Sequence, residues 1–62
     1  MSKILKDLLN EYLDANVRTW DGFNADYWYE RFITKYDKIW GFSEDEKDEI
    51  IEYLNRLEME NE

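Results

Sequence analysis

Apolar side chains return every three or four residues in three separate stretches of this chain, and no other sequence feature restricts its fold as strongly. In the first stretch they come as adjacent pairs four positions apart: Ile4, Leu5, Leu8, Leu9, Tyr12 and Leu13. Such spacing places one broad apolar stripe along an α-helix, whereas a half-buried strand would alternate every second residue. The pattern predicts a helix over about residues 2–17, with Ser2 as its N-cap.

A second helix is predicted over residues 25–40, after the Asp21-Gly22 turn signal, where glycine permits a positive φ. Either Asn24 or Asp26 can act as its N-cap. Its apolar side chains project within about 140° of arc at 100° per residue. They are Trp28, Tyr29, Phe32, Ile33, Tyr36, Ile39 and Trp40. The other side of the helix is polar and includes Glu30, Arg31, Thr34, Lys35, Asp37 and Lys38.

The boundary between the second and third helices is marked by short-range signals. Gly41 follows the last apolar residue, where a left-handed residue commonly closes a helix, and Phe42 can fold back onto the helix end. Ser43 and Glu46 have the S-x-x-E spacing of a capping box. A third helix is therefore predicted over about residues 44–59, with a buried stripe of Ile50, Ile51, Leu54 and Leu57.

The chain has no cysteine and no histidine, which excludes disulfide bonds and the usual thiolate or imidazole metal sites. A chain of 62 residues therefore depends on packing for its stability, and its eleven aromatic residues can bury a large area. We expect an all-α, compact three-helix bundle that forms a single domain over residues 1–62.

The same composition argues against an enzyme. Nucleophilic Ser/His and Cys/His arrangements need residue types that are absent, and two glycines cannot build a phosphate-binding loop. A pair of catalytic carboxylates would need a pocket for which so small a bundle has little room. Asp21, Asn24 and Asp26 could ligate a hard cation, but an EF-hand pattern is absent, and a turn with a helix cap explains these residues better. We expect no catalysis, cofactor or metal.

Negative charge is concentrated in the last third of the chain. The whole sequence has a net charge of −8, and residues 43–62 contribute −7 of it, from nine acidic residues against Lys47 and Arg56. At 100° per residue, five of these acids fall on one arc opposite the predicted buried stripe. They are Glu44, Asp45, Asp48, Glu49 and Glu52.

A second acidic row, Asp7, Glu11 and Asp14, follows one side of the first predicted helix. If the two rows adjoin, their carboxylates form one surface with a helical-turn spacing, comparable to the phosphates of a nucleic-acid strand. Such a surface could occupy the cationic groove of a nucleic-acid-binding enzyme, held by the lysines and arginines that would contact phosphate. The alternative is a solubilising face, since net charges of magnitude about 2–8 are ordinary for small domains.

Aromatic residues outside the apolar stripes suggest a different mode of binding. Trp20 and Phe23 lie in the first connection, and Tyr27 falls on the polar side of the second helix. Exposed Trp and Tyr are enriched at interaction hot spots, so Trp20 and Tyr27 could anchor a partner or a second copy of the chain. The competing interpretation is that Trp20 and Phe23 close one end of the bundle, which leaves Tyr27 as the better candidate for exposure.

These patterns favour a non-catalytic protein-binding module of the cytoplasm, an inhibitor or modulator that docks on a basic surface of a partner protein. Its acidity opposes direct binding to nucleic acid or anionic lipid, and no run of about 18 apolar residues could span a membrane. Phage-encoded inhibitors of host nucleic-acid machinery, such as antirestriction and anti-CRISPR proteins, are often small and acidic and lack cysteine and histidine. That likeness is one of class, without a shared motif. The alternative is a structural or adaptor module that forms a homodimer or docks through aromatic residues.

Overall fold

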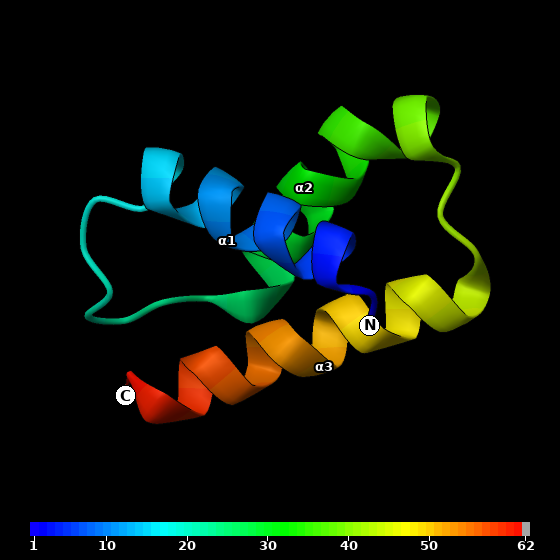
Figure 1. Ribbon diagram of the computed structural model, residues 1–62. Helices are drawn as coiled ribbons and strands as arrows, with labels where there is room; N and C mark the ends of the chain where they lie inside the picture. The colour runs from blue at the N-terminus through cyan, green and yellow to red at the C-terminus, as the bar shows by residue number, and fades with distance from the viewer. Residues whose placement is uncertain (62) are drawn as a thin grey trace.

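A computed structural model describes residues 1–61, and these residues form three helices and no strand (Figure 1). They are α1 (Lys3–Asn16), α2 (Ala25–Trp40) and α3 (Glu44–Glu60). Each helix runs antiparallel to the one before it, and the predicted three-helix bundle is confirmed (Figure 1). Every helix begins and ends within one residue of the bounds expected from periodicity.

The first two helices begin at side chains that accept hydrogen bonds from backbone N–H groups. The Ser2 hydroxyl accepts from the N–H of Leu5 at 3.2 Å, as predicted. The Asn24 amide oxygen accepts from the N–H of Tyr27 at 3.0 Å, so Asn24 rather than Asp26 caps α2. Asp26 lies instead in the first turn, where a negative charge suits the positive end of the helix dipole.

The connection from α2 to α3 follows its predicted signals. Gly41 has φ 61° and ψ 58°, a left-handed conformation that lacks a steric penalty only for glycine, and its N–H donates to the Asp37 carbonyl at 2.7 Å. The Ser43 hydroxyl accepts from the N–H of Glu46 at 3.2 Å, and the Glu46 carboxylate accepts from the N–H of Ser43 at 3.0 Å. Phe42, between these two motifs, is buried.

Aromatic rings fill the centre of the bundle. Phe32 of α2 is 0% exposed and stacks on Phe42, with ring centroids 5.7 Å apart. Tyr12 of α1 meets the ring of Phe32 edge to face at 5.6 Å, and also contacts the rings of Trp28 and Tyr36. These contacts join α1 to α2. The buried residues of all three helices and their connections are Leu5, Leu9, Tyr12, Leu13, Val17, Phe23, Ala25, Phe32, Phe42, Ile50 and Leu54.

The apolar stripes are not covered along their whole length, because residues at two helix ends are exposed. Ile4, the second residue of α1, is 68% exposed, and the last two residues of α2, Ile39 and Trp40, are 75% and 45% exposed. Helical periodicity assigns a direction to each side chain, but not whether a neighbouring helix extends far enough to cover it. These three residues of the apolar stripes therefore lie outside the core.

A hydrogen bond between distant residues ties α3 to the start of α2. The carboxylate of Glu58 accepts from the N–H of Ala25 at 2.8 Å. Ala25 is the first residue of its helix and is buried, so its N–H has no intrahelical partner and little access to water. The carboxylate satisfies this group, and its negative charge suits the positive end of the α2 dipole.

Replacing Glu58 with alanine is expected to lower the free energy of unfolding by about 1–2 kcal/mol, because the N–H of Ala25 would lose its acceptor. Urea denaturation followed by circular dichroism measures this change. Glu60→Ala is the matched control, since Glu60 is exposed near the end of the same helix, and it should shift stability by less than about 0.5 kcal/mol. Equal stability of the two variants would show that the hydrogen bond contributes nothing.

Candidate binding surface

The outer face of α3 is acidic, whereas its inner face is the apolar stripe. Ile50 and Leu54 on the inner face are fully buried. Four of the acids predicted to bind a partner are exposed on the other side of the helix: Glu44, Asp45, Asp48 and Glu52. We call these four residues the α3 acidic strip. From its first to its last residue it extends roughly 12 Å along the helix axis, at 1.5 Å per residue.

Glu49, the fifth predicted acid of this arc, differs from the other four. It is only partly exposed, and its carboxylate contacts the amino group of Met1. This is the one ion pair formed within residues 1–61. The carboxylates of the α3 acidic strip are therefore paired with no lysine or arginine in the part of the chain that the structure describes.

Mutual repulsion within the strip has a cost for folding. Glu44 and Asp48, and likewise Asp48 and Glu52, are four residues apart, so each pair lies on neighbouring turns. Like charges at this spacing destabilise a helix by roughly 0.2–0.5 kcal/mol per pair. Because no ion pair offsets this repulsion, the strip presents a negative field to solvent and to any cationic partner.

A groove of about 290 Å³ lies between α1 and α3, and both acidic and basic groups line it, with Glu49 and Glu52 among the acidic ones. Lys6 of α1 and Arg56 of α3 are both part of the lining, and Lys6 Nζ lies 6.0 Å from the centre of the Tyr53 ring. The Tyr53 hydroxyl donates a hydrogen bond to the Asn10 side-chain oxygen at 2.5 Å, which holds the two helices together at this point.

The second acidic row, on α1, is exposed along its whole length. Asp7, Glu11 and Asp14 are all exposed, and none of them lines the groove between α1 and α3. These acids lie roughly opposite the buried Leu9 around α1, whereas Lys6 lies beside it on the side of α3. Lys6 and Arg56 therefore lie in the groove between α1 and α3 together with Glu49 and Glu52, and one merged acidic surface stays a prediction.

The two aromatic residues predicted to anchor a partner have different environments. Tyr27 is 51% exposed. Trp20 is half-buried, packs against the core and stacks on the buried Phe23, with ring centroids 5.1 Å apart. Trp20 and Phe23 thus match the competing interpretation, in which they cover part of the core, and Tyr27 is the aromatic candidate that is free to contact another molecule.

Comparison of the chain with protein-family models, with curated proteins and with solved structures finds no match. Among the described residues, no group of three or more acidic side chains is arranged to hold a metal ion. No helix formed by residues 1–61 is long and apolar enough to cross a membrane. Inferences about function therefore depend on the charge and shape of the surface.

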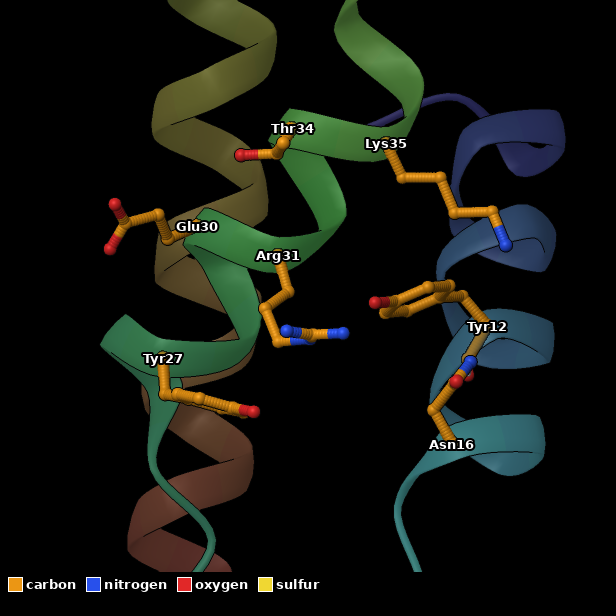
Figure 2. Close-up of a pocket in the computed structure, with 7 residues that line it drawn as sticks. All are labelled: Tyr12, Asn16, Tyr27, Glu30, Arg31, Thr34 and Lys35. Carbon is orange, nitrogen blue, oxygen red and sulfur yellow. The ribbon is translucent and has the colours of Figure 1, made fainter.

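A second groove, between α1 and α2, is a feature that the sequence analysis missed. It has a volume of about 490 Å³, and Arg31 and Lys35 of α2 lie in it opposite Tyr12 and Asn16 of α1 (Figure 2). Both basic residues were assigned only to the polar side of the second helix. Their spacing of one helical turn, beside an apolar stripe, is the sequence signal that could have identified them.

Proposed function

We propose that the protein is a non-catalytic binding module whose α3 acidic strip docks on a basic surface of a partner protein. The supporting observation is that Glu44, Asp45, Asp48 and Glu52 are exposed together and form no ion pair with a lysine or arginine within residues 1–61. A partner that supplies lysine or arginine gains charge-assisted hydrogen bonds to these carboxylates and removes the repulsion among them. The module acts as an inhibitor or modulator by covering that basic surface.

The partner that fits this strip best is a nucleic-acid-binding enzyme of the cytoplasm. Such enzymes bind phosphates through rows of lysine and arginine, and carboxylates four residues apart on a helix repeat about every 6 Å along the axis. Because the strip extends only roughly 12 Å along the helix axis, it matches a short cationic patch rather than a long duplex path. Nucleic-acid mimicry of this kind occurs among phage-encoded anti-host-defence proteins, which the chain resembles only in size and acidity.

Binding through the strip is expected to weaken steeply as salt is raised, because exposed charges are screened over about 10 Å at 0.1 M ionic strength. The immobilised protein should retain its partner from a cell lysate at 50 mM salt and release it on washing at about 300 mM. The captured protein should itself carry a basic surface, which its identification by mass spectrometry would establish. A partner that stays bound in 1 M salt would contradict docking through charge.

Salt-tolerant association is the result expected of the second candidate function, a structural or adaptor module that docks through Tyr27. The observation that favours it is the exposure of this ring, which packs edge to face on Trp28 with centroids 5.0 Å apart. Sedimentation at low and high salt distinguishes the two functions. A homodimer that persists at high salt and is lost in Tyr27→Ala would support the adaptor in place of the acidic docking module.

A further inference from the structure

The groove between α1 and α2 gathers positive charge in a chain whose net charge is −8. Figure 2 shows Arg31 and Lys35 extending from successive turns of α2 toward α1, where Tyr12 and Asn16 form the opposite wall. Glu30, the acid that lines the groove, extends away from its interior in the same view. The interior is therefore cationic.

Aromatic rings, not carboxylates, hold the two basic side chains in place. The guanidinium carbon of Arg31 lies 5.6 Å from the centre of the Tyr27 ring. The Nζ atom of Lys35 lies 5.6 Å from the centre of the Tyr12 ring and 5.5 Å from that of Tyr36. Contacts of this kind use the faces of the rings and leave N–H groups free to donate hydrogen bonds.

No counter-ion from residues 1–61 neutralises this pair, because neither Arg31 nor Lys35 belongs to the ion pair that these residues form. The two like charges are four residues apart and repel each other, which an isolated helix would disfavour. An anion bound between them would remove that repulsion and would accept hydrogen bonds from both side chains.

Two hydroxyl groups add donors to the same space. The hydroxyl of Tyr12 points across the groove toward the Arg31 guanidinium, and the hydroxyl of Tyr27 points into the groove from the end near the start of α2 (Figure 2). Only 7% of Tyr12 is exposed, so packing against the core fixes the position of its ring. The Tyr12 ring is thus a fixed part of the groove wall, and the donors converge on the groove interior (Figure 2).

We propose that this groove binds the phosphate group of a phosphate monoester. A phosphate monoester carries a charge of about −1.5 to −2 at pH 7 and offers three acceptor oxygens, which match two cations and the neighbouring hydroxyl groups better than the single charge of a carboxylate does. The groove volume of about 490 Å³ exceeds that of a phosphate and leaves room for the organic part of the ligand beside the tyrosine rings. This site is separate from the α3 acidic strip, and its charge is positive where that of the strip is negative.

The site is tested by titrating inorganic phosphate into ¹⁵N-labelled protein and recording amide shifts by NMR, with ionic strength held constant by sodium chloride. We expect saturable shifts at amides around Arg31 and Lys35, with half-saturation at millimolar phosphate. The double variant R31Q/K35Q should weaken binding at least tenfold. K3Q/K38Q removes the same charge at two exposed lysines that do not line the groove, and it should bind as the unmodified protein does.

Three results would overturn the phosphate site. The first is that phosphate causes no saturable shift beyond that of chloride, and the second is that R31Q/K35Q saturates as the unmodified protein does. The third is that acetate saturates the same amides at equal or lower concentration, which would assign the groove to carboxylates instead. The spectra also show whether each variant is folded, and the outcome does not depend on any protein partner of α3.

Discussion

Replacement of Phe32 with alanine is expected to leave the protein largely unfolded at 25 °C. Phe32 is the centre of the core, where it is fully buried and contacts the rings of Tyr12, Tyr36 and Phe42. Truncation of a buried phenylalanine costs about 3–5 kcal/mol, through lost transfer free energy and the cavity that remains. The core of a domain this small rarely supplies more than about 3–5 kcal/mol in total, so this one change can remove all of it.

Circular dichroism at 222 nm as a function of urea measures the loss. Phe32→Leu, which keeps most of the buried volume, should remain folded with reduced stability, so that an effect can be measured even if the alanine variant does not fold. Ile39→Ala is the matched control on the same helix, because Ile39 is exposed, and it should change stability by less than about 0.5 kcal/mol. Similar urea midpoints for Phe32→Ala and Ile39→Ala would show that the centre of the core lies elsewhere.

Reversal of the charges at Asp48 and Glu52 to lysine is expected to weaken partner binding more than 100-fold. Loss of one member of a desolvated charge pair costs about 2–5 kcal/mol, and a factor of ten corresponds to about 1.4 kcal/mol. Two such losses weaken binding by more than 100-fold, and the new lysines are also repelled by the lysines and arginines of the partner. The partner should therefore no longer be captured from a lysate. Both side chains are exposed, so helicity and stability should change little.

A matched variant separates the position of these charges from their number. Asp21→Lys with Glu60→Lys changes two exposed acids outside the α3 acidic strip. Both double variants carry a net charge of −4 instead of −8. If capture depends only on net charge, the two variants will lose binding equally, and the proposed docking surface is wrong. Docking through the strip instead predicts that the Asp21/Glu60 variant retains most of its binding.

The bounds of the helices follow from signals that act over a few residues. Ser2, Asn24 and the capping box of Ser43 and Glu46 each satisfy an N–H group within three residues, and Gly41 ends α2 through its own backbone conformation. Such interactions form without any tertiary contact, so the sequence was sufficient to predict them. The acidic arc of α3 is local in the same sense, because helical geometry alone places its carboxylates on one face.

The packing of the helices against one another decided which side chains are covered and which residues meet across the grooves. Both depend on where each helix ends relative to its neighbours. Ile39 and Trp40 belong by periodicity to the apolar side of α2, yet Ile39 is 75% exposed, and Trp40 is 45% exposed although its ring stacks on Phe42. Packing also brought Lys6 of α1 and Arg56 of α3 into one groove, and it brought Tyr12 opposite Arg31 across the groove of α1 and α2. The spacing of residues in the sequence predicts which side of its helix a side chain lies on. Contacts between helices arise only when all three helices pack around one core.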